Sequence, residues 1–362
     1  MKQFDLVGKG VKLVLKENVL AVLSDAPLNT VSSAFHNGGG LKKTSIILNV
    51  EVPKSCADRT LHDDPDAFIV NASKTFGILG SFIGVVTAAA VANYSLVSKR
   101  NGEFAVSVVA TAADNEGNTC NFSESAGEPI EVQEDAGTIN IIVVVDGNPT
   151  ESCLVGLIIT ATEAKMAALK ELDIRSRFSG DEATGTVTDA IVVAETSRGA
   201  PIVYGGPASP LGQLVGYCTR KAVKEAVMKA NECMPCRSLF VRLKERHLSV
   251  EKMAAELAKA KSLGLDEKTL ATSLAKLLRT NPFYASIVLA AVKMDEDMAK
   301  GLVPPEIGDE KAVSKKFGEV LLSKQAPSNV AYSSDYDAVD LPPFLKQVLI
   351  NIVKVALSEK TN

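Results

Sequence analysis

Apolar residues follow two different patterns along the 362-residue chain. In the N-terminal part they form short β-branched runs separated by glycines and polar turns, which is typical of strands. Near residue 233 such runs become scarce, and apolar positions recur with helical spacing instead. The pattern predicts an α+β domain over residues 1–232, with helices packed on a mixed sheet. A small all-α domain is expected over residues 237–362.

The two expected domains differ in their elements. The runs that predict strands are Val11–Leu15, Val19–Leu23, Ile46–Val52, Ser81–Ala90, Phe104–Ala112 and Gly137–Val145, and a further apolar run covers Ile191–Ala194. Two long helices are expected in the same domain, over Thr150–Leu172, with Thr150 as its N-cap, and over Leu211–Ala230. The helices expected in the second domain are Leu239–Glu245, Val250–Ala260, Glu267–Leu278, Ser286–Met298, Ala312–Leu322 and Phe344–Ala356.

Composition and charge narrow the class of protein. Hydrophobic residues make up 46% of the chain and charged residues 23%, which is ordinary for a globular protein. The formal net charge of -4 provides no basic surface for nucleic acid. The longest apolar tract, Phe82–Ala92, is about half as long as a bilayer span requires, and the first residues lack a secretory signal pattern. We therefore expect a cytoplasmic protein without a membrane span. Whether it forms a homo-oligomer stays open.

Candidate metal and redox residues are few. Cys233 and Cys236 form a CxxC pair, which fits a plain structural role, a metal shared between subunits or an adventitious disulfide. The three histidines are His36, His62 and His247, and they form no zinc-hydrolase motif. We expect a protein that requires no metal or other cofactor of its own.

Two polar segments interrupt the apolar pattern. In the first, Ser33, His36 and Asn37 precede three glycines at residues 38–40, which suits an oxyanion cradle and equally a hairpin turn. In the second, threonines at 184, 186 and 188 lead into Asp189. Their hydroxyls supply hydrogen bonds without bulk, in a substrate site or along a strand edge where threonines pair across a sheet.

Five sequence blocks connect these segments to a known family. In chain order they are Ser32-Ser33-Ala34 with Asn37-Gly38-Gly39, Gly137-Thr138-Ile139-Asn140-Ile141, Thr160-Ala161-Thr162-Glu163-Ala164-Lys165, Ala183-Thr184-Gly185-Thr186-Val187-Thr188-Asp189-Ala190 and Leu211-Gly212-Gln213-Leu214-Val215-Gly216. Together, over about residues 5–230, they resemble the CbiZ family of adenosylcobinamide amidohydrolases. The order of the blocks is more specific than any one of them.

The resemblance implies an activity and a set of site residues. The activity is hydrolysis of adenosylcobinamide to adenosylcobyric acid and 1-amino-2-propanol, in corrinoid salvage for cobalamin synthesis, with a substrate that carries its own cobalt. We expect Glu163 or Asp189 to act as general base on water. Asn37 would hold the oxyanion with the N–H groups of Gly38 and Gly39. The expected substrate-binding residues are Ser33, His36, Gly38, Gly39, Asn140, Thr160, Thr184, Thr186 and Thr188.

Several alternatives stay open for this first domain. A triad of Ser32 or Ser33 with His36 and Asp189 is one, although no Gly-x-Ser-x-Gly elbow is present. Asp114 and Glu116 either line the active site or are turn residues. This chain departs from the family pattern at Val187, where the family has a glycine, and at residues 207–210. A corrinoid-binding protein without hydrolytic activity is therefore the alternative function.

The C-terminal region faintly resembles the phosphatidylglycerophosphatase A-like domain that acts as an α-ribazole-phosphate phosphatase. An acidic run, Asp295-Glu296-Asp297, and a final apolar helix carry this resemblance. The catalytic blocks are not intact, and residues 328–340, with Asp335, Asp337 and Asp340, stand where they would be expected. We expect a catalytically silent domain that aids assembly or covers the corrinoid; a bifunctional enzyme with phosphatase activity is the alternative.

Overall fold

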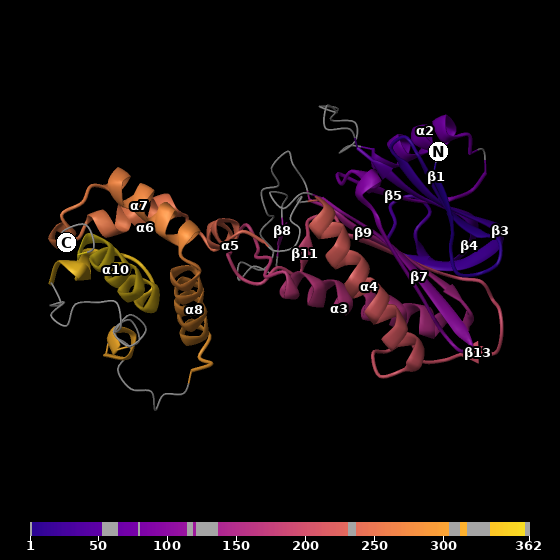
Figure 1. The fold of residues 1–362 in the computed structure, drawn as a ribbon. Coiled ribbons are helices and arrows are strands. Elements are labelled where there is room, and N and C mark those ends of the chain that lie inside the picture. The colour runs from indigo at the N-terminus through magenta and orange to yellow at the C-terminus, as the bar shows by residue number, and fades with distance from the viewer. Residues whose placement is uncertain are drawn as a thin grey trace. The chain divides into compact units, whose positions relative to one another are not determined.

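The chain forms two compact units, Met1–Ser238 and Leu239–Asn362 (Figure 1). The structure is a computed structural model, and it describes residues 2–52, 64–78, 80–113, 119–120, 137–230, 237–303, 312–316 and 334–358. The first unit combines a mixed sheet with helices, and the described elements of the second are helical, so the predicted fold class is confirmed. The predictions for His62, Asp114, Glu116, Cys233 and Cys236 lie outside the described residues.

A nine-stranded mixed sheet forms the centre of the described part of the first unit. Its strands are β1 (Lys2–Asp5), β2 (Val11–Lys16), β3 (Val19–Ser32), β4 (Gly39–Glu51), β5 (Ile83–Thr87), β6 (Ser95–Asn101), β7 (Phe104–Ala112), β9 (Ile139–Asp146) and β12 (Ala190–Glu195). The hydrogen-bonded order is β1-β2-β3-β12-β9-β7-β6, and β4 joins β3 to β5 off this path. Within this sheet β12 and β9 are parallel, as are β4 and β5, and the other pairs are antiparallel.

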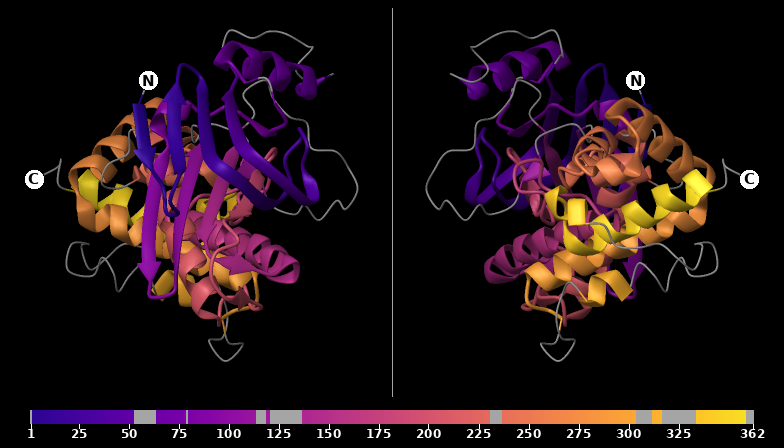
Figure 2. Two further views of the ribbon diagram at one scale, coloured as in Figure 1. Left: turned by 90° about the vertical axis from the view of Figure 1, so that its right-hand side faces the viewer. Right: turned by 90° about the vertical axis from the view of Figure 1, so that its left-hand side faces the viewer.

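The sheet curls around an apolar interior (Figure 2). The first half of β3 pairs with β2 and its second half with β12, with an irregularity between Leu23 and Leu28. Asn140 of β9 then reaches across the curl to Asn49 Oδ1 of β4, at 2.9 Å, and to the carbonyl of Val86 in β5, at 2.7 Å. The residues that fill the interior include Leu13, Leu20, Ile47, Ile83, Val109, Ile142 and Val192.

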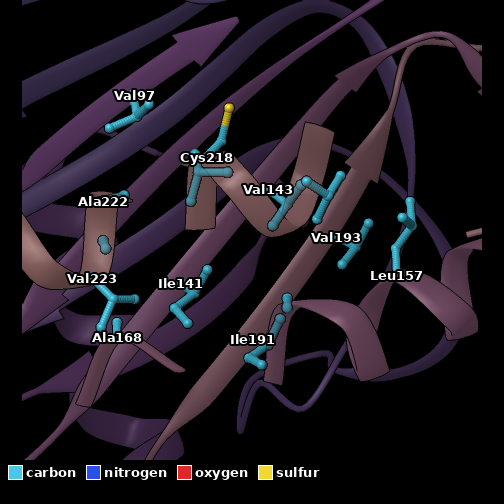
Figure 3. Packing of buried hydrophobic residues seen from close by; sticks show 14 of the residues in the cluster. Val97, Ile141, Val143, Leu157, Ala168, Ile191, Val193, Cys218, Ala222 and Val223 are labelled. Carbon is cyan, nitrogen blue, oxygen red and sulfur yellow. The ribbon is translucent and has the colours of Figure 1, made fainter. Parts of the chain in front are cut away.

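Two long helices, α3 (Glu151–Glu171) and α4 (Pro210–Ala230), cover the outer face of β9 and β12 (Figure 3). Ile141 and Val143 of β9 point toward these helices, whereas Ile142 and Val144 point into the curl. Because both faces of β9 are buried, its sequence is a continuous apolar run rather than an alternating one. The predictions of a central strand and of both helices are confirmed.

The N-terminal end of α3 also follows the prediction. Thr150 Oγ1 accepts a hydrogen bond from the backbone N–H of Cys153 at 3.3 Å, so Thr150 is the N-cap. Among the described helices, α3 alone has the length and hydropathy of a membrane span, and 44% of its most apolar window is buried. Its buried residues, such as Leu154 and Leu157, pack in the core against the sheet, as in the core helix of an α+β fold.

Short elements complete the first unit. They are α2 (Pro65–Phe76), the 3-10 turn Val91–Asn93, and two small two-stranded pairs, β10 (Asn148–Pro149) with β13 (Pro201–Ile202) and β8 (Thr119–Cys120) with β11 (Gly185–Thr186). The periodicity did not predict α2 or β6, and it ended the second strand at Leu23. In the structure β3 continues to Ser32 because pairing with β12 and β4 satisfies the backbone of this more polar stretch.

The described part of the second unit consists of helices and 3-10 turns around an apolar core. They are α5 (Leu239–Glu245), α6 (Val250–Ala258), the 3-10 turn Lys261–Leu263, α7 (Glu267–Thr280), α8 (Pro282–Ala299), the 3-10 turn Ser334–Ala338 and α10 (Pro343–Ser358). Ser249 and Asp266 are N-caps, since each accepts a hydrogen bond from a backbone N–H three residues later. Five of the six predicted helices are present within a few residues of their expected bounds. The sixth prediction, 312–322, is described only at 312–316, which is helical.

Candidate active site

Asp189 lies just before β12 and accepts four hydrogen bonds. Its Oδ1 accepts from the backbone N–H of Ile139, at 2.9 Å, and from Thr186 Oγ1, at 2.5 Å. Its Oδ2 accepts from the backbone N–H of Thr186, at 3.1 Å, and from the ammonium group of Lys165. One carboxylate thus joins the start of β9, the segment at β11 and helix α3.

Lys165 reaches Asp189 from the buried side of α3. The two side chains are only 8% and 12% exposed, so the ion pair lies largely out of water. Removing two charges from water is costly, and a buried pair contributes little net stability. Losing one partner, however, would leave an uncompensated buried charge and cost about 3–5 kcal/mol. A pair of this kind is therefore better explained by a chemical role than by a need for stability.

Gly185 allows the backbone to pass beside this ion pair. A Cβ atom at residue 185 would lie 2.4 Å from Asp189 Oδ2 and 2.8 Å from Lys165 Nζ. Real Cβ atoms do not approach other atoms so closely, and any larger residue would displace one or both charged groups. The glycine of the fourth sequence block is therefore needed for a close approach to the pair.

Cys120 of β8 borders the ion pair on the side of β11. Its carbonyl oxygen accepts hydrogen bonds from the backbone N–H of Thr184, at 2.9 Å, and from Thr184 Oγ1, at 3.4 Å. Burial raises the pKa of the Cys120 thiol; the Asp189 carboxylate raises it further, and the Lys165 ammonium opposes both. The thiol stays protonated near neutral pH, which does not suit a nucleophile. Within the described ranges, no three His, Cys, Asp or Glu side chains are grouped as metal ligands.

A pair of threonine hydroxyls lies beside Asp189. Thr138 Oγ1 and Thr188 Oγ1 are 2.8 Å apart, and Thr188 Oγ1 also donates to the carbonyl of Gly137 at 3.2 Å. Thr138 is buried and Thr188 is exposed, so the pair links the interior to the surface. We call Thr138, Lys165, Gly185, Thr186, Thr188 and Asp189, with Cys120 beside them, the Asp189 cluster. Three of the five sequence blocks meet in it.

The N-terminal polar segment approaches the same edge of the sheet through Ser33. Its backbone N–H donates to the carbonyl of Ile191 at 3.0 Å, and its hydroxyl accepts from the N–H of Ile191 at 3.0 Å. Ile191 is two residues after Asp189, so Ser33 extends the ladder between β3 and β12 at the end where the Asp189 cluster lies. The Ser33 side chain is exposed.

His36 and Asn37 form a separate group. His36 Nδ1 lies 2.6 Å from Asp66 of α2, and its ring stacks on Phe82 with 4.3 Å between ring centroids. Asn37 Nδ2 lies 3.0 Å from His36 Nε2 and donates to the carbonyl of Phe82 at 3.0 Å. The carboxylate beside His36 is therefore Asp66, and the predicted triad with Asp189 is not formed. The amide of Asn37 therefore ties its loop to the backbone of Phe82, and its predicted role at an oxyanion stays a prediction.

The glycines after Asn37 shape a tight turn. A Cβ atom on Gly38 would lie 2.1 Å from the carbonyl oxygen of Ala34, and Gly39 has a φ of 100°. Both positions therefore exclude residues with a side chain. The hairpin-turn interpretation accounts for these residues, because they connect β3 to β4, which pair with each other from Ser32 and Gly39 onward.

Three predicted site residues lie away from the Asp189 cluster. Glu163 is exposed and two positions from Lys165, which places it on another side of α3. Thr160 is buried and donates to the carbonyl of Gly205 at 2.8 Å, which fixes the loop before α4. Asn140 is buried inside the curl, where it ties β9 to β4 and β5.

Sequence reasoning missed Lys165 and Thr138 as site residues, although both stand in the sequence blocks. The position of Lys165 could have indicated its role. It stands four residues after Ala161 and four before Leu169, on the apolar side of the predicted helix. A lysine on the core side of a helix is rarely without a partner. No comparable signal was available for Thr138, whose partner Thr188 is 50 residues away.

The sequence matches that of a known family over most of the first unit. Residues 7–235 match the CbiZ family, described as adenosylcobinamide amidohydrolase. An uncharacterised protein of Methanocaldococcus jannaschii is 38% identical over 101 residues, which are 28% of this chain and 39% of that protein. An adenosylcobinamide amidohydrolase of Methanosarcina mazei is 29% identical over 221 residues, which are 59% of this chain and 92% of that protein. The match therefore spans about two fifths of the first relative's length.

A solved structure of a β-aminopeptidase from a Burkholderia species is also similar, with 13% sequence identity and a TM-score of 0.31. It covers 64% of this chain and 83% of the aminopeptidase. A likeness of this size does not bear on the mechanism. The family match, in contrast, covers more than half of the chain and includes every residue of the Asp189 cluster. The chain therefore belongs to the CbiZ family of adenosylcobinamide amidohydrolases and is an amidohydrolase.

Proposed function

We propose that the protein hydrolyses the amide bond of adenosylcobinamide to adenosylcobyric acid and 1-amino-2-propanol, in corrinoid salvage for cobalamin synthesis. We further propose that the reaction takes place at the Asp189 cluster, without a cofactor other than the cobalt that the corrinoid itself carries. The observation that carries the proposal is the buried Lys165–Asp189 pair. Sequence blocks separated by dozens of residues supply the groups around it, as an active site requires and a simple strand connection does not.

Lys165 is proposed to stabilise the transition state. Water adds to the amide carbon, negative charge develops on the carbonyl oxygen, and the C–N bond breaks as the leaving amine takes up the proton that the water loses. A cation held in place in a site largely closed to water stabilises this oxyanion strongly, because the surroundings have a low dielectric constant. The four hydrogen bonds of Asp189 keep the ammonium group in position.

The two carboxylates predicted as general base, Asp189 and Glu163, have different surroundings. Both oxygens of Asp189 already accept two hydrogen bonds each, which suits a positioning residue better than a base. Glu163 is exposed on another side of the helix. We therefore propose that the hydroxyls of Ser33, Thr186 and Thr188 orient water and amide beside Lys165.

The test is a product analysis with matched variants. Wild-type protein incubated with adenosylcobinamide should release equal amounts of adenosylcobyric acid and 1-amino-2-propanol, measured by mass spectrometry. The double variant Lys165→Gln, Asp189→Asn removes both charges together while keeping similar shapes, and it should lose at least about a hundredfold in turnover. Glu163→Gln on the same helix is the control and should keep wild-type turnover.

Two outcomes would contradict the proposal. If wild-type protein shifts the absorption spectrum of the corrinoid without releasing aminopropanol, the protein is a corrinoid-binding protein instead. If the double variant turns over normally while circular dichroism shows an intact fold, the reaction takes place elsewhere in the chain.

For the helical unit we propose a role without catalysis, in assembly or in covering the corrinoid. Two of its acidic residues hold backbone groups in place: Asp295 accepts from the backbone N–H groups of Phe344 and Leu345, at 2.8 and 2.9 Å. Asp335 accepts from the N–H and hydroxyl of Ser262, at 2.6 and 2.9 Å. These two carboxylates therefore stabilise the fold of the helical unit. Incubating the full chain with α-ribazole phosphate should release no phosphate, and release would show the bifunctional alternative.

A further inference from the structure

Helix α3 has an apolar stripe on the side that faces away from its own core. Val155, Ile159 and Met166 are 51%, 56% and 40% exposed. Steps of four and seven residues place all three on one side of a helix, with Thr162 between the last two. Leu154 and Leu157 on the other side are buried against the sheet. Exposed apolar groups gathered in this way mark an interaction surface.

Opposite charges stand at the two ends of this stripe. Glu151 is at the start of α3 and Lys170 near its end, and both are exposed. The stripe then contains six positions, at residues 151, 155, 159, 162, 166 and 170. Their spacing, four, four, three, four and four residues, is the same when it is read from either end. Because a glutamate stands at one end and a lysine at the other, with apolar residues between them, the stripe is complementary to a second copy of itself turned end over end.

The contacts of such a pair follow from the spacing. With a two-fold axis between residues 159 and 162, Glu151 faces Lys170 of the partner subunit, and Val155 faces Met166 of the partner subunit. Ile159 packs beside the axis. Both ends then join opposite charges, and the two helix dipoles run in opposite directions, which is favourable. A parallel pair would instead place glutamate against glutamate and lysine against lysine.

The surroundings of the stripe also favour a second copy of this chain. Lys170 has an ion pair with Glu182 at 3.3 Å, but these side chains are 70% and 43% exposed, so the contact is weak and easily exchanged. A membrane-surface helix would carry a basic border instead, whereas Glu163 lies beside this stripe.

We infer that α3 forms an antiparallel, two-fold symmetric contact with α3 of a second copy of this chain, and that this contact makes the protein a homodimer. The helix is about 31 Å long, from 21 residues at about 1.5 Å each, so the contact extends over its whole exposed side.

Sedimentation equilibrium of the full chain at micromolar concentration tests the inference. Wild-type protein should be a dimer, and Ile159→Asp should be a monomer, because it places two carboxylates beside the axis. Leu302→Asp is the matched control: Leu302 is 66% exposed but belongs to the second unit, and this variant should remain a dimer. All these positions are exposed, so the fold should survive, as circular dichroism would show.

The charged ends give a sharper test. Glu151→Lys and Lys170→Glu should each raise the dimer dissociation constant about tenfold, because each creates two like-charge contacts. The double variant should return to the wild-type value, since it restores both pairs in reverse. A monomeric wild-type protein would overturn the inference, and so would a dimer that survives Ile159→Asp. Binding of the wild-type chain to phosphatidylcholine vesicles through α3, without dimerisation, would show that the stripe meets a membrane instead.

Discussion

Each unit contains a largely buried ion pair that joins two separate elements, and the two pairs have different surroundings. In the first unit, Lys165 and Asp189 meet among threonine hydroxyls, backbone N–H groups and a glycine. In the second, Arg246 Nε lies 2.7 Å from Glu296 Oε1, with side chains 7% and 18% exposed, and joins the end of α5 to α8. Arginine is a planar, permanently charged group suited to fixed contacts, whereas lysine is a compact charge that often serves in catalysis.

The cores around these pairs differ in the same way. The buried polar and charged residues of the first unit include Thr30, Ser32, Asn49, Ser107, Thr111, Thr138, Asn140, Thr160, Lys165 and Glu195. In the described part of the second unit, Ser314 is the only polar residue buried as fully, since Arg246 and Glu296 are intermediate in burial as whole residues. Buried polar groups need partners and are kept at a cost in stability. Their concentration in one unit indicates where the chemistry is located.

The largest expected effect separates the two ion pairs. Lys165→Met and Arg246→Met each remove the cation from a largely buried ion pair, so each should lower the free energy of unfolding of its own unit by about 3–5 kcal/mol. Turnover should differ sharply: Lys165→Met should lose at least about a hundredfold, and Arg246→Met should keep wild-type turnover wherever the protein is folded. Urea unfolding and product release measure the two quantities. An inactive but folded Arg246→Met would contradict this division of roles.

A smaller effect is expected when a side chain is added at Gly185, beside the Lys165–Asp189 pair. Gly185→Ala places a Cβ atom within 2.4 Å of Asp189 Oδ2, so the carboxylate and Lys165 must shift. We expect turnover to fall about tenfold to a hundredfold, because small displacements of catalytic groups are costly. Circular dichroism should show little change. Gly102→Ala is a control in a surface turn where a Cβ meets no atom, although its φ of 54° adds mild strain, and it should remain active.

High pH should destabilise the first unit selectively. Burial raises the pKa of the Cys153 and Cys218 thiols to about 11, from an ordinary value of 9.0. The unfolded chain therefore loses these protons first, and stability is lost as the pH rises from 9 to 11. The loss should be about 2–3 kcal/mol for each thiol by pH 11, because each pKa lies about two above its ordinary value and a difference of one corresponds to about 1.4 kcal/mol.

The second unit contains no cysteine and serves as the internal control. Urea unfolding at pH 8 and pH 11 should show the difference, and Cys218→Ala should reduce it. An equal loss in wild type and variant would show that other groups are responsible.

The smallest expected effect concerns a helix cap in the second unit. Asp266 accepts a hydrogen bond from the N–H of Thr269 at 3.0 Å, so Asp266→Ala should lower the melting temperature of the helical unit slightly. Because this effect is local to the helical unit, turnover of the amide should not change. Thermal unfolding and product release measured on the same preparation would check both statements, and a loss of turnover would link the helical unit to the reaction.

The fold was predictable where the local pattern decides it. Strand β9 is a continuous apolar run because both of its faces are buried, and Thr150 caps helix α3. Both elements could therefore be predicted from the sequence. The curl of the sheet was not predictable. It depends on contacts such as that between Asn140 and Asn49, which are 91 residues apart, and no local pattern encodes their meeting.

The candidate site was predictable in part for the same reason. Asp189 and Thr186 stand in one short segment, so their joint role could be expected from sequence. On α3 the sequence blocks indicated Glu163 as a general base and gave no role to Lys165. Helical geometry nevertheless puts Lys165, not Glu163, on the core side. The contact between His36 and Asp66 could not be expected, because Asp66 lies on a helix that periodicity did not indicate, and the open alternative therefore paired His36 with Asp189.

The most direct test compares the two neighbouring charges on α3. Turnover of adenosylcobinamide by Lys165→Met and by Glu163→Gln should be measured side by side at saturating substrate, with folded protein quantified in each sample. We predict a loss of at least about a hundredfold for Lys165→Met and a change of less than about threefold for Glu163→Gln. Normal turnover by Lys165→Met, or loss of turnover by Glu163→Gln alone, would show that the buried ion pair is not the catalytic centre.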